Sequence, residues 1–397
     1  MRYFILVFLV LTSLFAKDFK IATYNVQNLF DLNRDGSEYK EYIPNTKSRW
    51  NKKNFNLKLK HISQVIRDLD ADILALEEVE NLRAARALNR ALRGKKYPYI
   101  YTFFKRYKHT IDSVVFSRYP VSIKYSVKVV GYSRAIHVLK FYLDQHKITL
   151  YVNHWPAYKH GYKARALYAK KLKSVLNTKE ESVIFGDLNT PFRIDKNGWG
   201  KSLRDILDVG NIDKPLYDLW YEVPPTIRYT HVYGRSKNAL DHIIISKNFF
   251  DGKNIEYKTD SFGVFRPKYL LDKYGYPKRW ILKNGKVHIG VGYSDHLPIY
   301  AIFQTKPYSK KKIKSVSIGY LKNMFNDLLP VVLKNIEAIR VDKYGLTIAD
   351  GKDKIKIYLP DDKFEEGKKY DILVKKIGKY HRNMEIRLCK IIREVKK

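Results

Sequence analysis

The sequence predicts a two-domain protein in which a large α+β domain precedes a small β-barrel. Helical and strand patterns alternate through residues 17–304, with polar residues gathered where apolar strands end. Residues 315–397 instead contain short strands separated by glycine turns. The chain has 397 residues, more than one typical domain, and its 45% hydrophobic content is sufficient to form buried cores.

The large domain is expected to alternate strands and amphipathic helices. A first strand is expected at 21–26, and helical spacing is then followed by Ile62, Val65, Ile66 and Leu69. Asp70-Ala71-Asp72 ends that pattern, and the apolar run at 73–76 predicts a buried strand. The remaining elements are expected to be a helix around 168–176 and strands at 113–116, 148–152, 182–185, 239–245 and 297–303.

A basic linker, residues 306–314, is expected to join the two domains, because it contains the run KPYSKKK. Beyond it, strands are expected at 337–341, 346–349, 355–359, 370–375 and 385–389. Five short strands suit a small barrel of the oligonucleotide/oligosaccharide-binding (OB) kind, and a generic β-sandwich is the alternative. The 315–397 domain is therefore expected to bind nucleic acid.

The first 16 residues, MRYFILVFLVLTSLFA, are expected to form a cleaved secretory signal. One arginine precedes an apolar run that is too short to span a bilayer. A retained anchor is the alternative, because Leu14 is bulky for its place before a cleavage site. The single cysteine, Cys389, excludes an intrachain disulfide. We therefore expect an exported monomer, periplasmic or extracellular, without stable membrane insertion after cleavage.

The chain is strongly basic, since 76 Lys and Arg residues against 40 Asp and Glu residues give 76 − 40 = +36. Such a field attracts nucleic acid, anionic lipid or phosphorylated substrates, and does not choose among them. Six short clusters place polar residues at apolar strand ends. They are 24–28 (YNVQN), 76–79 (LEEV), 151–156 (YVNHWP), 186–189 (GDLN), 240–242 (LDH) and 294–296 (SDH). Any one of them reads as a turn or cap, but six together indicate a site.

In this order, the clusters resemble the endonuclease/exonuclease/phosphatase superfamily, which includes pancreatic-type deoxyribonuclease and sphingomyelinases. The amino-acid sequence at 22–30 (ATYNVQNLF), 152–156 (VNHWP) and 240–242 (LDH) is most similar to that of secreted bacterial nucleases. The resemblance implies that residues 17–305 form a four-layer α/β/β/α sandwich, with a cleft where the strand ends meet.

The resemblance also implies a metal site and a catalytic site. The implied metal ligands are Asn25, Glu78 and Asp295, and hard oxygen ligands favour Mg²⁺ or Mn²⁺, with a structural Ca²⁺ left open. The implied catalytic residues are His154 at the phosphate or as the acid for the leaving group, Asp187 orienting or deprotonating water, Asn189 binding phosphate, and Asp241 orienting His296. The carboxylate partner of His154 cannot be placed from the sequence.

Some residues leave alternatives open. Arg118 and Arg165 could bind flanking phosphates, or could form surface salt bridges. Some family members carry Asp where this chain has Gln27, which puts a second metal site in doubt. His242 is expected to point away from the cleft, because side chains alternate along a strand.

These observations predict a secreted, metal-dependent nuclease that cuts DNA endonucleolytically with little sequence specificity, with RNA left open. One alternative is a secreted phospholipid phosphodiesterase of the sphingomyelinase type. For that function, residues 269–280 are the single weak candidate for a membrane hairpin, although they could also form a loop over the cleft. A second alternative is a binding module without activity, which the complete set of motif residues speaks against.

Overall fold

The computed structural model describes residues 17–103, 111–143, 145–193, 198, 200–211, 213–305, 313–323, 330–380 and 383–395. The expected signal, residues 1–16, and residues 306–312 of the expected linker lie outside the described residues. Within the described part of the chain, no helix combines the length and the apolar character needed to cross a membrane.

Two β-sheets form the centre of the large domain. In the first, the strands lie in the order β14 (Glu256–Tyr257), β18 (Ile299–Gln304), β1 (Asp18–Leu29), β2 (Ile73–Val79), β4 (Asp112–Ser117) and β3 (Tyr99–Thr102), and β15 (Gly263–Val264) also pairs with β18. In the second, the order is β5 (Val121–Lys128), β6 (Ala135–Leu143), β7 (His146–His154), β8 (Ser182–Asp187), β13 (Asp241–Ser246), β10 (Leu216–Asp218) and β9 (Val209–Gly210).

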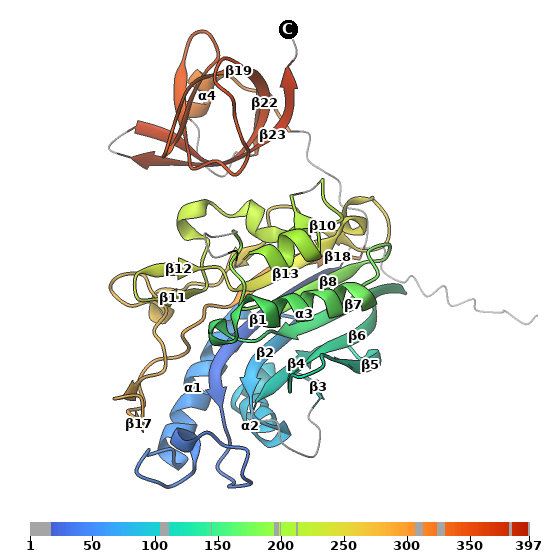
Figure 1. Cartoon of the computed structure of the whole chain (residues 1–397), viewed down its shortest axis with the longest axis vertical. Helices are drawn as coiled ribbons and strands as arrows, with labels where there is room; N and C mark the ends of the chain where they lie inside the picture. The colour runs from blue at the N-terminus through green and yellow to red at the C-terminus, as the bar shows by residue number, and fades with distance from the viewer. Residues whose placement is uncertain are drawn as a thin grey trace, which may run out of the picture.

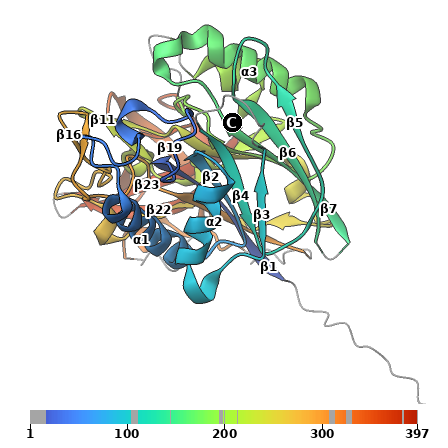
Figure 2. The same cartoon turned by 90° about the horizontal axis from the view of Figure 1, so that it is seen from below.

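Helices cover the outer faces of both sheets, as Figure 2 shows. The helices α1 (Lys52–Leu69) and α2 (Leu82–Ala91) lie on the first sheet, and α3 (Gly161–Val175) lies on the second. Asn51 caps the start of α1 by accepting from the backbone of Asn54, and Asp70 ends the helix in a left-handed conformation, φ 49°. The four-layer α/β/β/α sandwich that the sequence predicted is therefore confirmed.

Short elements connect these layers. Two small hairpins are formed by β11 (His231–Tyr233) with β12 (Ser236–Asn238), and by β16 (Leu282–Lys283) with β17 (Val287–His288). A π-helical turn covers Ser202–Ile206. The 3₁₀ turns are Lys40–Tyr42, Arg93–Lys95, Tyr158–His160, Leu219–Glu222, Pro225–Ile227, Lys247–Phe250 and Lys268–Leu270.

The core between the sheets is built by alternate residues of facing strands. Phe19, Ile21 and Val115 of the first sheet pack against residues of the second that include Leu150 and Val183. The intervening residues of the same strands, such as Ala22 and Leu74, face α1 and α2 in a separate cluster. Both faces of the central strands, such as β1, β2, β7 and β8, are thus buried, which leaves the ends of these strands as the place where their polar side chains can reach solvent.

The described residues of the smaller domain form a closed five-stranded barrel, which confirms the predicted barrel. Its strand order is β19 (Val331–Asp342), β20 (Gly345–Ala349), β21 (Lys354–Tyr358), β23 (Asn383–Val395) and β22 (Lys369–Tyr380), and β22 pairs back to β19. The short helix α4 (Ile318–Lys322) precedes it. The barrel has its own apolar core, which includes Ile336, Ile348, Ile357, Ile372 and Ile386.

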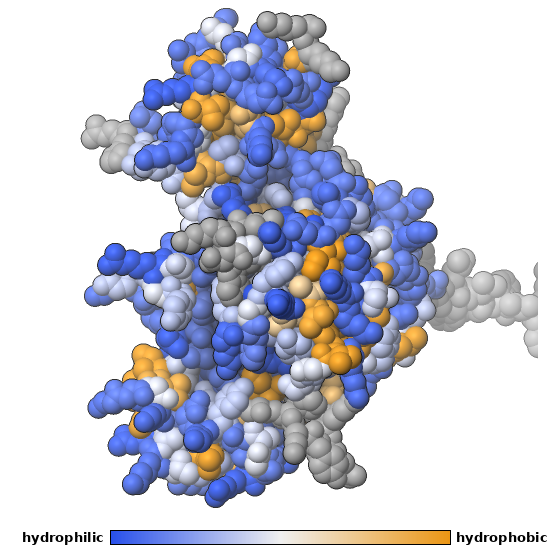
Figure 3. Space-filling model, viewed as in Figure 1, coloured by the Kyte–Doolittle hydropathy of each residue, from blue (hydrophilic) through white to orange (hydrophobic). Residues whose placement is uncertain are grey.

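Ion pairs connect the barrel to the large domain, above which it lies in Figure 1. Asp361, which follows β21, pairs with the buried Arg228 and accepts a hydrogen bond from Arg193 at 2.8 Å. Lys375 of β22 reaches the carboxylate of Asp260 at 3.1 Å and that of Glu222 at 4.0 Å. The surface outline is indented between the two domains in Figure 3, where hydrophilic residues cover most of the visible face.

We predict that Gly186→Ala destabilises the protein by about 3 kcal/mol, because the new Cβ would lie 2.0 Å from the carbonyl oxygen of Asn153 at φ +125°. Gly234→Ala is the matched control. Gly234 also has positive φ, +58°, but no atom lies within 4 Å of its Cβ position, so the expected cost is about 1 kcal/mol. Urea unfolding measures the free energy of unfolding of both variants. An equal loss of stability in the two would show that the close contact between Gly186 of β8 and Asn153 of β7 adds no cost of its own.

Candidate active site

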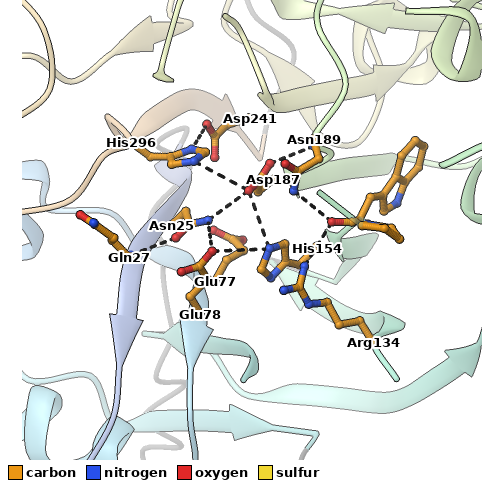
Figure 4. Close-up of polar contacts among 12 residues, drawn as sticks. Asn25, Gln27, Glu77, Glu78, Arg134, His154, Asp187, Asn189, Asp241 and His296 are labelled. Carbon is orange, nitrogen blue, oxygen red and sulfur yellow. Dashed lines mark hydrogen bonds and ion pairs between the residues drawn. The ribbon is translucent and has the colours of Figure 1, made fainter. Parts of the chain in front are cut away.

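The polar clusters meet at one edge of the two sheets, because neighbouring strands run in compatible directions. β1 is parallel to β2, and β7 is parallel to β8, so the carboxyl ends of each pair lie together. β13 runs antiparallel to β8 and pairs Asp241 with Asp187 at this same edge. Figure 4 shows the side chains of both sheets converging on Asp187 and Asn25.

Asn25 joins the two sheets at the centre of the site. Its Nδ2 donates to Oε1 of Glu78 at 3.1 Å and to Oδ2 of Asp187 at 3.0 Å. Its Oδ1 accepts from the backbone of Gln27 at 3.0 Å. Asn25 therefore holds a carboxylate of each sheet at a fixed separation, and the oxygen expected to bind metal here accepts a backbone hydrogen bond.

A strained backbone aims these groups into the site. Gln27, Asn28 and Glu78 all have positive φ, of 51°, 59° and 65°. The register of β1 and β2 shifts between Asn25 and Leu29, as in a β-bulge. As a result the backbone N–H of Asn28 donates to Oε2 of Glu78 at 3.0 Å. Both oxygens of Glu78 are thus oriented by β1.

Glu78 and Asp295 line one cavity of about 690 Å³. Burial raises the pKa of Glu78, and the negative charge of Asp295 raises it further. Neighbouring carboxylates in a partly buried wall are stabilised by a cation, and oxygen ligands suit a hard divalent ion. Glu78 and Asp295 therefore fit a divalent metal, with Asp187 on the other side of Asn25.

Asp187 is the most central carboxylate. Its Oδ1 accepts from the backbone of Asn189 at 2.9 Å, and the Asn189 amide donates to the carbonyl of Trp155 at 3.0 Å. Burial raises the pKa of Asp187 to about 7, with Asp241 acting in the same direction and His296 opposing it. A carboxyl group with such a pKa can take a proton near neutral pH.

His296 forms a charged pair with Asp241. Its Nδ1 lies 2.7 Å from Oδ2 of Asp241, and the hydroxyl of Thr230 donates to the same oxygen. Its Nε2 points toward Asp187, with 3.9 Å to Oδ2. Burial alone would lower the pKa of His296, but Asp241 and Asp187 raise it well above 6.5. The ring is therefore protonated on both nitrogens, and its Nε2–H faces the carboxylate of Asp187.

His154 is placed differently, as a buried neutral ring. Its Nε2 lies 3.8 Å from Oδ2 of Asp187 and 3.9 Å from Oε1 of Glu78. Its Nδ1 is buried, and no hydrogen-bond partner for it exists among the described residues. Burial lowers the pKa of His154 well below 6.5, assisted by the charges of Arg134 and His296. A neutral ring can hydrogen-bond a phosphate, but it has no extra proton to give a leaving group.

The two arginines that the sequence suggested for phosphate binding lie outside the site. Arg118 follows β4 at the opposite edge of the first sheet, where it pairs with Asp70 at 2.5 Å and Asp72 at 2.9 Å. Arg165 is fully buried and donates to the carbonyls of Pro156 and Ala157 at 3.4 Å. Arg118 thus forms the surface salt bridges that were its alternative, and Arg165 shapes the segment after His154.

His242 points away from the site, as strand alternation predicted. Its Nδ1 lies 3.0 Å from Oδ2 of Asp218, and its Nε2 lies 2.8 Å from the carbonyl of Thr190. Both ring nitrogens are thus used in holding β13 to its neighbours.

Sequence reasoning missed Arg134 and Glu77. Arg134 donates to the carbonyl of Trp155 at 3.2 Å and lies beside His154 in Figure 4. It comes from a turn before β6 that carries no motif, so its position depends on tertiary packing. Glu77 accepts from the hydroxyl of Thr23 at 2.7 Å between the sheets, and burial raises its pKa well above 4.5. Alternation along β2 could have separated the inward Glu77 from Glu78.

We predict that Asp241→Asn lowers the titration midpoint of His296, because the neutral amide no longer favours the protonated ring. NMR of the histidine rings in the presence of a chelator measures this midpoint. His61, whose pKa burial lowers and on which Asp241 does not act, is the internal reference. An unchanged midpoint for His296 would contradict the assigned pair.

Several solved structures resemble this fold. An endonuclease/exonuclease/phosphatase from Beutenbergia cavernae DSM 12333 is 13% identical, with a TM-score of 0.49 over 91% of this chain and 82% of that one. A family protein from Bacteroides thetaiotaomicron is 16% identical, with a TM-score of 0.47 over 73% and 99%. A humanized D. rerio TDP2 carrying 14 mutations is 13% identical, with a TM-score of 0.48 over 72% and 98%.

A comparison with curated proteins gives no match. Residues 20–305 match the family described as the Endonuclease/Exonuclease/phosphatase family, which is well over half of the chain. The enzymes of this family hydrolyse phosphodiester bonds and depend on divalent metals. The chain therefore belongs to the endonuclease/exonuclease/phosphatase family.

Proposed function

We propose that this protein is an exported, Mg²⁺-dependent nuclease that cuts DNA internally with little sequence specificity, and RNA is the second nucleic acid to test. The observation that carries the proposal is the central bridge of Asn25 between Glu78 and Asp187, faced by the His296–Asp241 pair. This arrangement supplies a base, a proton carrier and a metal-binding wall around one point. Export is supported by the N-terminal sequence of the chain.

The proposed chemistry uses these groups in turn. A water molecule attacks phosphorus and gives its proton to Asp187, whose pKa of about 7 suits this role. The protonated His296 faces the phosphoryl oxygens and stabilises their negative charge, while Asp241 accepts the Nδ1 hydrogen bond that orients the ring and keeps it charged. A divalent ion bound by Glu78 and Asp295 would polarise the phosphate and assist departure of the alkoxide.

The charge of the chain supports nucleic acid as the substrate. A formal charge of +36 gives sequence-independent attraction to a polyanion, and this attraction falls as salt rises. The site residues described above are directed at a phosphodiester and not at bases.

The barrel supports the same proposal through one outer face. Arg387 lies 5.0 Å above the ring of Tyr358, and Lys343 lies 4.8 Å from the ring of the exposed Tyr344. Basic side chains next to aromatic rings suit the backbone and bases of a single strand. Tyr358 is also close in sequence to Asp361, which contacts Arg193 just beyond Asn189. We therefore propose that the additional strand-binding surface lies on β21, β23 and the turn between β19 and β20.

A phospholipid head group is the second candidate substrate. The expected hairpin at 269–280 gives it little support, because Leu270 and Trp280 of that segment are buried. The next segment favours it more, because Ile281, Ile289 and Val291 are 39%, 45% and 50% exposed near the metal-binding cavity.

We expect Mg²⁺-dependent nicking of supercoiled plasmid that both Glu78→Gln and His296→Ala reduce at least about 100-fold. His160→Ala is the matched control, because His160 is an exposed histidine outside the site. The assay compares plasmid, linear DNA, RNA and sphingomyelin vesicles, each with Mg²⁺ or chelator. Cleavage of sphingomyelin with intact plasmid would favour the phospholipid alternative and reject the nuclease.

We expect Tyr358→Ala and Arg387→Gln each to weaken binding of a fluorescent single-stranded oligonucleotide about tenfold, because stacking and a phosphate contact are lost. Fluorescence anisotropy with chelator present measures this affinity. Hydrolysis of bis(p-nitrophenyl) phosphate, which is too small to reach the barrel, should change less. Arg393→Gln on the same strand is the control: Arg387 and Arg393 each pair with a carboxylate, Glu385 at 3.0 Å and Asp371 at 2.8 Å, but it is Arg387 that lies over the ring of Tyr358. Equal effects on the oligonucleotide and on the small substrate would reject this surface.

A further inference from the structure

Arg279 lies on the wall of the cavity that also contains Glu78 and Asp295. We propose that Arg279 binds a phosphate group next to the scissile phosphodiester, so that the site selects substrates with consecutive phosphates. This inference rests on the proposed nuclease function and deepens it. It would make the enzyme prefer a polynucleotide over any substrate that carries one isolated phosphodiester.

Of the described side chains, Arg279 is the one anion-binding group on a cavity wall that is otherwise acidic. Glu41, Glu78 and Asp295 line the wall, and Arg279 is the one basic side chain among the described residues that line it. Within the described chain, Arg279 forms no ion pair with any of these carboxylates, and the residue is exposed. Its guanidinium is therefore available to a ligand, and its planar fork matches two oxygens of a phosphate.

The backbone next to Arg279 is fixed by Gln27. The backbone N–H of Trp280 donates to Oε1 of Gln27 at 2.7 Å, and Nε2 of Gln27 donates to the carbonyl of Trp280 at 3.1 Å. The Trp280 side chain is fully buried, and Lys58 lies 5.2 Å from its ring while donating to the carbonyl of Gln27. Gln27 is therefore a positioning residue for Arg279.

This contact also explains the amide at position 27, where some family members carry Asp. A carboxylate could accept from the N–H of Trp280, but it has no proton to donate to the carbonyl. The amide makes both bonds, and it adds no negative charge to a wall that already holds Glu78 and Asp295. In this chain, the residue at position 27 holds the backbone of the segment that carries Arg279.

The other side of Arg279 is fixed by Gly292. Residues 278–281 pair with 291–293 through bonds from Tyr293 N to the carbonyl of Lys278, 2.7 Å, and from Ile281 N to that of Val291, 3.0 Å. A Cβ on Gly292 would lie 1.8 Å from the carbonyl oxygen of Arg279. Gly292 closely precedes the SDH motif at 294–296. The pairing therefore fixes the position of the Arg279 backbone relative to Asp295 and His296.

The test compares substrates that differ by one phosphate. Dithymidine monophosphate has a single phosphodiester, and the same compound with a 5′- or a 3′-terminal phosphate presents a neighbouring phosphate on either side. With Mg²⁺, we expect wild-type kcat/KM to be at least about tenfold higher for one phosphorylated form. Arg279→Gln should remove most of that preference, and Arg279→Lys, which keeps charge without the fork, should restore part of it.

Lys286→Gln is the matched control, because it removes the same charge from the adjacent hairpin without altering the cavity wall. It should keep the wild-type preference. Equal kcat/KM for all three compounds, or an equal loss on all three with Arg279→Gln, would overturn the role of Arg279 and leave the nuclease proposal standing. Failure of the wild-type protein to cleave these compounds and plasmid alike would reject both.

Discussion

The structure of the site depends on one side-chain amide that joins two sheets. Asn25 donates to Glu78 from its own sheet and to Asp187 from the other, and both carboxylates are needed within one small volume. Burial raises the pKa of both carboxylates, and a further carboxylate raises each of them more, Asp295 for Glu78 and Asp241 for Asp187. The Asn25 amide and the protonated His296 offset part of this cost, and the proposed divalent cation would offset more of it. The packing of the two sheets therefore determines how close Glu78 and Asp187 lie, and with it the protonation and metal binding of the site.

Much of this arrangement could be predicted from sequence, because strand ends leave a local signature. Apolar runs that stop at Asn, Asp, Glu or His mark the edge of a sheet, and parallel pairing of β1 with β2 and of β7 with β8 brings those ends together. The barrel was predicted for a similar reason, since glycine turns separate its short strands. Both signals depend on residues near each other in the chain.

Arginine positions could not be predicted in this way. Arg118 and Arg165 follow recognisable segments, yet one pairs with two aspartates far from the site and the other is buried under a loop. Arg134 and Arg279, in contrast, have no motif and reach the site edge and the cavity wall through contacts with distant segments. A long flexible side chain takes its partner from the tertiary structure. The amide of Gln27 shows the same limit, since its partner is 253 residues away.

The ion pairs of Asp361 and Lys375 have a consequence for the length of the substrate. Domains joined only by a flexible tether present a range of separations to a ligand, and a second contact then forms at almost any strand length. Here Arg228 and Asp260 hold the barrel at one distance from the site. A strand that is bound at both places must span that distance, and a shorter one engages only one of them. The enzyme would thus show a minimum oligonucleotide length, above which affinity rises in a single step.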